Sequence, residues 1–224
     1  MAIVVSDMEL AHRHLQLFDM EPISPVPQTI PADNPAAGGV QAFRFRDVDG
    51  HSLELIWFPA DKRKPKWQAP GERLFLGIDH SEIAISQTEK SLAFYQDILG
   101  LSVASGSNNT GTVQATLDNL PAADVKITSL QPSDQPTSMG IELLEYLQPQ
   151  DSRPRPQIWQ MKDLPHRHLV LDVDSLNLHG LNHHKITIVS PGIVQLPDAY
   201  RYSRGVLIKD HDVHSLLLVA APLF

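Results

Sequence analysis

An eleven-residue phrase occurs twice in this chain, and the repeat constrains the fold more than any other feature of the sequence. RDVDGHSLELI spans residues 46–56, and KDHDVHSLLLV spans residues 209–219. Asp, Asp, His and Ser stand at the same four places in both copies. Internal repetition of this kind indicates a repeated supersecondary unit. The copies differ at one chemically important position, because Glu54 in the first corresponds to Leu217 in the second.

The pattern of apolar residues predicts three units along the chain, each with the element order βαβββ. Residues 7–18, for example, carry apolar side chains at the spacing of an amphipathic helix. In chain order, the expected elements are strands at 2–6, 40–45 and 52–58 with a helix at 7–18, then strands near 83–86, 112–117, 125–130 and 141–147 with a helix at 88–99, then strands near 168–174, 185–189, 205–209 and 215–219 with a short helix around 175–183. Stretches that contain Pro or Gly, at 62–71 and 148–156, separate the three units.

Composition excludes several classes of protein. The absence of cysteine excludes disulfides and thiolate metal sites, and it is consistent with a cytoplasmic location. A formal net charge of −8 disfavours a nucleic-acid partner, which selects a basic surface. No apolar run approaches the length of about 18 residues that a membrane-spanning helix needs, so no membrane partner is expected. Eleven histidines in 224 residues justify a search for metal ligands.

Two phrases resemble the vicinal-oxygen-chelate superfamily, which includes glyoxalase, bleomycin-resistance and extradiol-dioxygenase proteins. GIDHSEIAISQTEKSLAFYQDILGL, at residues 77–101, is similar to the opening of a module in that family, and FRDVDGHSLELIWFP, at residues 45–59, is similar to a module ending. The resemblance covers nearly the whole chain. It implies an α+β fold of repeated βαβββ modules that pair into a half-open mixed β-barrel, with three modules in this chain.

Because modules of this family come in pairs, the resemblance implies a division of the chain. Residues 74–224 are expected to form a paired-module domain, and residues 61–73 a linker. Residues 1–60 are then an orphan module, similar to the second half of another pair. Two interpretations of the orphan stay open. Either the chain is a fragment of a longer four-module protein, or the orphan pairs with a copy of itself in a homo-oligomer.

The resemblance also implies a metal site. In this family a divalent metal is commonly held by a residue at the start of strand 1 and by a carboxylate on strand 4 of each module. His80 and His168 stand at the strand-1 positions of the second and third modules, and Glu142 in IELLEYL stands at the strand-4 position of the second. Glu145 is the alternative, although its odd offset places it on the opposite face of a strand. This ligand set suits Zn, Fe, Mn or Ni, and Leu217 adds nothing to it.

Three functions follow as hypotheses. The first is a metal-dependent lyase, isomerase or dioxygenase, in which the metal chelates two neighbouring oxygens of a small oxygen-bearing molecule. The second is a metal-free small-molecule-binding protein of the bleomycin-resistance type. The third is an inactive truncated paralogue. Neither a phosphate-binding loop nor a G-x-S-x-G nucleophile elbow occurs in the sequence, and the residues assign no catalytic group and no substrate.

Overall fold

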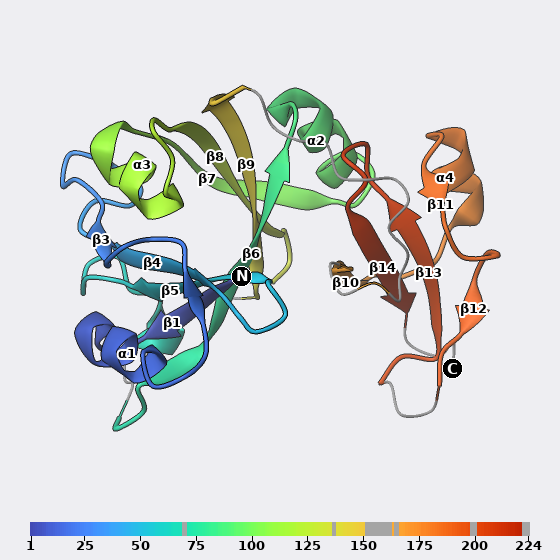
Figure 1. Cartoon of the computed structure of the whole chain (residues 1–224). Helices are drawn as coiled ribbons and strands as arrows, with labels where there is room; N and C mark the ends of the chain where they lie inside the picture. The colour runs from blue at the N-terminus through green and yellow to red at the C-terminus, as the bar shows by residue number, and fades with distance from the viewer. Residues whose placement is uncertain (69–70, 136–137, 151–162, 164–165, 198–200, 221–224) are drawn as a thin grey trace. The chain divides into compact units, whose positions relative to one another are not determined.

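The structure of the chain is a computed structural model that describes residues 1–68, 71–135, 138–150, 163, 166–197 and 201–220. It is α+β, as predicted, and consists mostly of open mixed sheet with few helices (Figure 1). The chain divides into two compact units. The first comprises residues 1–88 and 100–152, and the second comprises residues 89–99 and 153–224.

The first unit contains a nine-stranded sheet with two helices and one 3₁₀ turn. Its elements are β1 (Ala2–Val5), α1 (Met8–Leu15), β2 (Glu21–Pro22), β3 (Gln28–Thr29), β4 (Gln41–Arg46), β5 (Ser52–Trp57), η1 (Pro65–Trp67), β6 (Phe75–Ile85), β7 (Leu101–Thr110), α3 (Gly111–Asp118), β8 (Asp124–Pro132) and β9 (Gly140–Gln148). The strand order is β2-β4-β5-β1-β6-β9-β8-β7, and β3 pairs with β4 outside this path. The predicted strands near 2–6, 40–45, 52–58, 125–130 and 141–147 are therefore all present.

The sheet joins the first two predicted modules into one continuous layer. In each module the first strand pairs in parallel with the last, as β1 does with β5 and β6 with β9. The two halves meet where β1 runs antiparallel to β6, with Ala2 opposite His80. Hydrogen bonding between the first strands therefore joins the first module to the second within the chain, and the assignment of residues 1–60 as an orphan module stays a prediction. The pairing of the second and third modules within 74–224 stays a prediction.

The sheet of the first unit has a different environment on each face. Side chains at odd positions of β4 and β5, such as Phe43 and Leu55, pack against α1 in one hydrophobic cluster. Side chains at even positions, such as Ala2 and Ile56, belong to a second cluster with Trp67 of η1. The period of two along a strand explains this separation. The face that α1 leaves open carries the polar residues discussed in the next subsection.

Residues 112–117 form a helix, so the strand predicted there was wrong. Their sequence, TVQATL, has apolar residues at every second position, as in a strand, but Val113 and Leu117 are also four residues apart, as on one face of a helix. Helix α3 ends at Asn119, whose φ of 53° is the left-handed conformation common at helix C-termini. The helix packs Ala115 against Val125 and Leu144 of the sheet. The consequence for the site is that Asp118, at the end of α3, faces the sheet.

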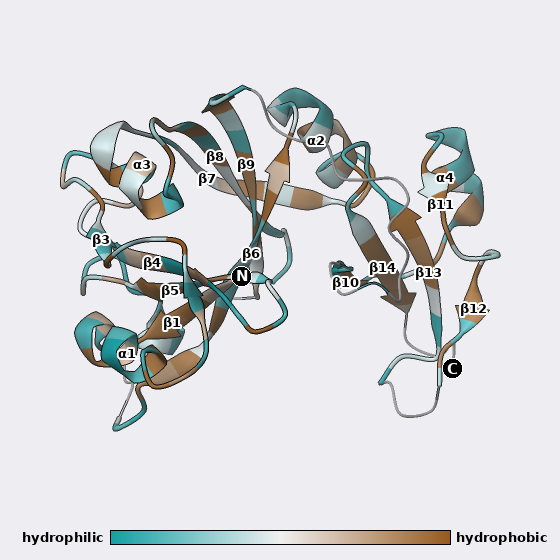
Figure 2. Ribbon diagram, viewed as in Figure 1, coloured by the Kyte–Doolittle hydropathy of each residue, from teal (hydrophilic) through white to brown (hydrophobic). Residues whose placement is uncertain are grey.

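The second unit contains a five-stranded sheet and two helices. Its elements are α2 (Thr88–Tyr95, of which Thr88 belongs to the first unit), β10 (His168–Asp172), α4 (Leu178–His183), β11 (Thr187–Ile188), β12 (Val194–Gln195), β13 (Arg204–Lys209) and β14 (Ser215–Ala220). The strand order is β10-β14-β13-β11, and β12 pairs with β13. Apolar residues concentrate in the central strands β13 and β14 (Figure 2). The first and last strands of this module, β10 and β14, are again parallel neighbours.

The repeated phrase forms the same hairpin turn in both units. In the first copy Asp47 Oδ1 accepts a hydrogen bond of 2.8 Å from the amide of His51, and in the second Asp210 Oδ1 accepts one of 2.8 Å from the amide of His214. The same histidine rings contact the second carboxylate oxygen, at 3.3 and 2.9 Å. These bonds satisfy turn amides that no strand partner reaches. The shared Asp and His residues therefore have a structural explanation.

The two turns differ in strain at their fourth residue. Gly50 has a φ of 80°, and Val213 occupies the equivalent place with a φ of 67°. A β-branched side chain is unfavourable in this left-handed region, whereas glycine is not. We therefore expect Val213→Gly to raise the free energy of unfolding by about 1 kcal/mol, after the greater freedom of glycine in the unfolded chain is included.

Urea denaturation of the unaltered protein and of Val213→Gly measures this difference in the free energy of unfolding. The matched control is Gly50→Val, which places the strained residue in the first copy and should lower stability by roughly 1–3 kcal/mol. A Cβ atom at position 50 would meet no other atom within 4 Å, so the effect of Gly50→Val reports on the backbone conformation alone. A stabilised Gly50→Val protein, or a destabilised Val213→Gly protein, would contradict the explanation.

Candidate metal centre

Polar side chains form a row across the sheet of the first unit, on the face that α1 does not cover. The register places Arg44 opposite Glu54, Glu54 opposite Ala2, and Ala2 opposite His80. Residues that face one another across strands project to the same side of a sheet. Glu82 lies on this side as well, because it follows His80 by two positions on β6. Strand pairing thus gathers these residues from β4, β5 and β6.

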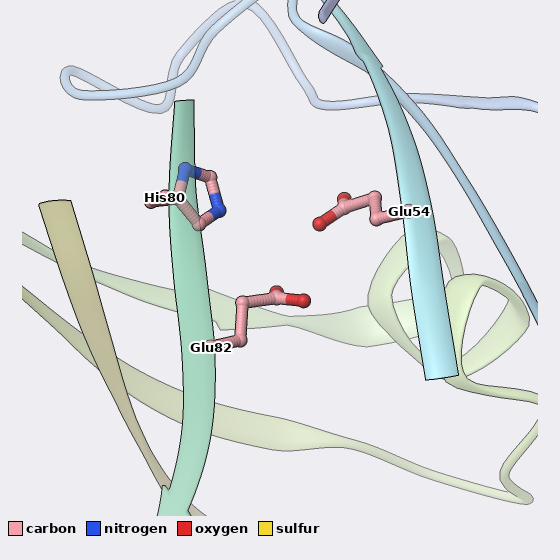
Figure 3. A group of neighbouring side chains, drawn as sticks. All are labelled: Glu54, His80 and Glu82. Carbon is pink, nitrogen blue, oxygen red and sulfur yellow. The ribbon is translucent and has the colours of Figure 1, made fainter. Parts of the chain in front are cut away.

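Glu54, His80 and Glu82 converge closely enough to share one ion. Each offers a ligand atom, and these atoms all lie within 4.8 Å of one another. Figure 3 shows Glu54 on one strand projecting toward His80 and Glu82 on the other. Glu54 and His80 are buried, with relative exposures of 4% and 5%. Strand β1 lies between β5 and β6, and its residue in this row is Ala2, whose small side chain leaves room for the three longer ones.

Glu142 approaches the same imidazole from the other side. It lies opposite Glu82 in the parallel pairing of β6 with β9, and its Oε2 is 3.4 Å from Nε2 of His80. Its Oε1 accepts a hydrogen bond of 2.8 Å from Ser129 on β8. Glu145 instead accepts a hydrogen bond from the hydroxyl of Thr88. Of the two glutamates that the sequence left open, Glu142 is therefore the one beside His80.

A buried carboxylate orients the His80 ring. Nδ1 of His80 lies 3.2 Å from Oδ2 of Asp79, and since an ionised carboxylate only accepts hydrogen bonds, we assign the Nδ1 proton to this contact. Asp79 also accepts bonds of 2.9 Å from Lys64 and 3.0 Å from the indole of Trp67. These donors hold the pKa of Asp79 well below its usual value, although burial alone would raise it. The arrangement directs Nε2 of His80 into the site, as in many histidine metal ligands.

Arg44 supplies a fixed positive charge at the edge of the row. Its guanidinium is 2.5 Å from Oε1 of Glu82 and also pairs with Asp118 at the end of α3. Tyr146 donates a hydrogen bond of 3.2 Å to Asp118. Although burial disfavours a charged guanidinium, Glu82, Glu54 and Asp118 together keep the pKa of Arg44 well above its usual value. Arg44 is therefore cationic and holds Glu82 in place.

The ionisable groups of the row shift one another's pKa values strongly. Burial, together with the negative charge of Glu82, raises the pKa of Glu54 to about 8. Burial acts against the charged form of His80, but Glu142, Asp79 and Glu82 outweigh it and raise the pKa of His80 to about 9. Burial also opposes ionisation of Glu82, yet Arg44 and His80 lower its pKa to about 2. At neutral pH, Glu54 and His80 thus hold protons that a bound cation would displace.

The donor set fits a divalent metal. Nε2 of His80 is buried and forms no hydrogen bond to any described residue, and its contact with Glu142 lacks the geometry of one. Such an orphaned ring nitrogen is costly unless something binds it. One imidazole with neighbouring carboxylates matches the ligands of Zn, Fe, Mn and Ni. Glu54, His80 and Glu82, whose ligand atoms converge, would hold such an ion, and Glu142 lies beside His80.

The structure brings together two of the three ligands expected from the sequence, His80 and Glu142. His168 begins β10 in the second unit, where its Nδ1 lies 3.1 Å from Nε2 of His166, and its place in the ligand set stays a prediction. Sequence reasoning missed Glu54 and Glu82 as site residues. Both carried a signal: Glu54 is the carboxylate that distinguishes the two repeated phrases, and Glu82 shares a strand face with His80.

Comparison with known proteins identifies the family. A family model described as the glyoxalase, bleomycin resistance protein and dioxygenase superfamily matches residues 77–189, which are 113 of the 224 residues. The chain belongs to this superfamily. The resemblance stated from the sequence is therefore confirmed. No curated protein matches the chain.

Solved structures of this superfamily share the fold. Glyoxalase I from Zea mays is 14% identical with a TM-score of 0.64, and the match covers 98% of this chain but only 66% of the maize protein. A glyoxalase family protein from Bacillus cereus is 19% identical with a TM-score of 0.55, and the match covers 67% of this chain and 97% of that protein. Identities this low show the fold alone, and they confirm the predicted class of βαβββ modules in an open sheet. Among the described residues, no helix has the length and apolar character needed to cross a membrane.

The network around Arg44 makes a testable contribution to stability. Arg44→Met keeps much of the side-chain volume but leaves Glu82 and Asp118 without their cation, so we expect it to lower the free energy of unfolding by roughly 3–5 kcal/mol at pH 7. In the unaltered protein the pKa of Glu82 is about 2, below its usual value of 4.5. The stability gained from its ionisation is therefore complete above pH 4.5 and is lost as the pH falls toward 2.

The unaltered protein and Arg44→Met should therefore differ most in their free energy of unfolding above pH 4.5, and the difference should become smaller in acid. Chemical denaturation at several pH values measures it. Arg46→Met is the matched control. Arg46 lies two residues along the same strand and pairs with Glu21 at 3.8 Å on the surface, so its loss should cost less than about 1 kcal/mol. Equal effects of the two substitutions would contradict the special role of Arg44.

Proposed function

We propose that this protein is a metal-dependent enzyme of the superfamily that acts on a small oxygen-bearing molecule. The observation that carries the proposal is the convergence of Glu54 and Glu82 on His80, whose free Nε2 is buried and unbonded. A divalent metal bound there would supply a Lewis acid that binds two neighbouring oxygens of the substrate and stabilises negative charge on them. The proposal covers lyase, isomerase and dioxygenase chemistry, without a choice among them.

The proposed ligands are His80, Glu142 and Glu54. They follow the pattern implied by the sequence resemblance, in which each module contributes a strand-1 residue and a strand-4 carboxylate. Here the strand-4 carboxylates come from β5 and β9, and His80 comes from the first strand of the second module. Glu82 is already neutralised by Arg44, so we place it at the edge of the site as a neighbour that could share the ion.

The residues around the ligands have definable tasks. Asp79 holds the Nδ1 proton of His80, so that the proton a cation displaces is the one on Nε2, whose lone pair then faces the site. Ser129 donates to Oε1 of Glu142 and leaves Oε2 directed at His80. Glu54, whose pKa is raised to about 8 without a metal, holds a proton at neutral pH that a bound cation would displace. No further catalytic residue is assigned.

A metal-free binding function is the second candidate, because the charges of the site also balance without a metal. Protonated His80 faces Glu142 and Asp79, and Arg44 faces Glu82. A small-molecule-binding protein of the bleomycin-resistance type could retain such a network. Two further expectations from the sequence stay proposals. Homo-oligomerisation rests on the orphan module, and a cytoplasmic location rests on the absence of cysteine.

Metal binding is the decisive test. We expect Zn, Mn, Fe(II) or Ni to raise the melting temperature of the purified protein, and His80→Ala to abolish the shift. Glu54→Gln and Glu142→Gln should weaken binding by about tenfold or more, since each removes an anionic ligand. Thermal scans with and without metal, together with elemental analysis of the protein as purified, provide the measurement.

Glu145→Gln is the matched control, because Glu145 lies on the same strand as Glu142 but contacts Thr88 instead of His80. It should bind metal like the unaltered protein. His168→Ala tests the ligand predicted from the sequence, and a loss as complete as that of His80→Ala would place His168 in the set. If none of the four metals is found or raises the melting temperature, the binding function replaces the enzyme.

The pH dependence of metal affinity provides an independent check. His80 must lose a proton held with a pKa of about 9, and Glu54 one held with a pKa of about 8, before both can bind a cation. Below pH 8 the metal displaces these protons, so affinity should rise with pH by about tenfold per unit for each proton released. Isothermal titration in buffers of different ionisation enthalpy counts the protons. An affinity that is constant between pH 6 and 8 would argue against these two ligands.

A further inference from the structure

The 3₁₀ turn η1 directs two side chains at one carboxylate. The amide of Trp67 donates a hydrogen bond of 2.8 Å to the carbonyl of Lys64, and Pro65 opens the turn between them. Side chains three residues apart eclipse in a 3₁₀ turn, so Lys64 and Trp67 project to the same side. The ammonium of Lys64 donates to Oδ2 of Asp79 at 2.9 Å, and the indole of Trp67 donates to Oδ1 at 3.0 Å. A turn between two strands is thus bonded to a buried carboxylate of β6.

Strand β6 is shaped to receive the indole of Trp67. Gly77 has a φ of 147°, and a Cβ atom at this position would lie 3.0 Å from the Trp67 ring, too close for an ordinary contact. The ring therefore packs directly on the backbone of β6, two residues before Asp79. It also belongs to the hydrophobic cluster that contains Ala2 and Val4, and it is 8% exposed. This packing fixes the direction in which the indole N–H points.

A bulge in β6 brings Asp79 beside His80. Ala2 of β1 pairs with His80, but the next residue of β1, Ile3, pairs with Ile78, so Asp79 is an extra residue in the ladder. Neighbouring residues of a regular strand project to opposite faces, whereas a bulge re-aims side chains, and bulges recur next to active sites. Here Oδ2 of Asp79 lies 3.2 Å from Nδ1 of His80. The bulge and the turn thus serve the same contact.

We propose that Trp67 and Lys64 are positioning residues of the candidate metal centre. Both act through Asp79, which in turn holds the ring of His80. The inference rests on the proposed metal-binding function. A buried carboxylate with three donors around it cannot rotate without breaking a hydrogen bond that water would not replace. Because the carboxylate fixes Nδ1, it also fixes the direction of Nε2 across the ring.

Proton NMR of the full chain without metal tests the contact directly. The Nδ1 proton of His80, bonded to a buried carboxylate, should give a downfield resonance that exchanges slowly and that His80→Ala identifies by its loss. Trp67→Phe keeps an apolar ring but removes the indole donor. Lys64→Met removes the ammonium from a side chain that is 41% exposed, so this variant keeps its fold. Each substitution should move the resonance upfield and speed its exchange.

Trp57→Phe and Lys62→Met are the matched controls. The indole of Trp57 donates to the carbonyl of Ser6 at 3.1 Å, and the ammonium of Lys62 donates to the carbonyl of Pro35 at 2.9 Å. Each control therefore loses a donor of the same kind, from the same part of the chain, with a different acceptor. Both should leave the resonance unchanged.

Metal binding measures the consequence for the centre. Isothermal titration with Zn should give a dissociation constant about tenfold higher for Trp67→Phe and for Lys64→Met than for the unaltered protein and the two controls. The visible absorption of bound Co(II), which depends on ligand geometry, should change in the same two variants.

An unchanged His80 resonance in both Trp67→Phe and Lys64→Met would overturn the proposal. Unchanged Zn affinity together with an unchanged Co(II) spectrum in both variants would overturn it as well. Failure of the unaltered protein to bind either metal is a different result. It would contradict the proposed function, and the resonance of the metal-free protein would still decide whether the two residues position His80.

Discussion

The antiparallel pairing of β1 with β6 is the constraint on which the first unit depends. Each of these strands is bonded on its other side to its own module, β1 to β5 and β6 to β9. Without their mutual pairing both would be exposed edges with rows of unbonded amides and carbonyls, which proteins avoid. The same hydrogen bonds fix the register that sets Glu54 and His80 in one row. Because side chains alternate, a slip of one residue would send them to opposite faces and leave no site.

Electrostatics imposes the second constraint. Three glutamates, Glu54, Glu82 and Glu142, lie around one imidazole in a largely buried place, and like charges this close cannot all ionise without compensation. The chain resolves the conflict in two ways. Arg44 neutralises Glu82, and protons neutralise the remainder through the raised pKa values of Glu54 and His80. Protons and a guanidinium thus stand where a divalent cation would be favourable, which is why the site suits a metal and also why a metal must compete for it.

The sequence predicted the elements better than their assembly. Strand periodicity located β4, β5, β8 and β9, since each alternates or carries β-branched residues between turn signals, and it failed at α3, where TVQATL supports either period. The repeat identified Glu54 as a distinctive carboxylate, and alignment of module ends selected Glu142. No local pattern, however, determines which first strands pair across modules, because that choice depends on hydrogen bonding between residues 70 to 78 positions apart. The ligand set implied by the resemblance, from the second and third modules, therefore stays a prediction, and the sequence alone does not bring Glu54 into it.

The third module retains the turn residues of the repeated phrase but lacks the strand carboxylate, so the two parts of the phrase can be considered separately. His168 faces Ser215 on β14 just as His80 faces Gly140 on β9, so the two histidines hold equivalent places in their modules. Two residues further along, Glu82 and Glu142 correspond to Val170 and Leu217, and the row becomes apolar. Yet the Asp–His turn is retained with the same hydrogen bonds. In these two hairpins the aspartate accepts a hydrogen bond from the turn amide, whereas a carboxylate buried in a strand is tolerated only where a cation or an arginine compensates its charge. The Asp and His residues shared by the two copies therefore serve the hairpin, and the glutamate found in only one copy belongs to the candidate metal centre.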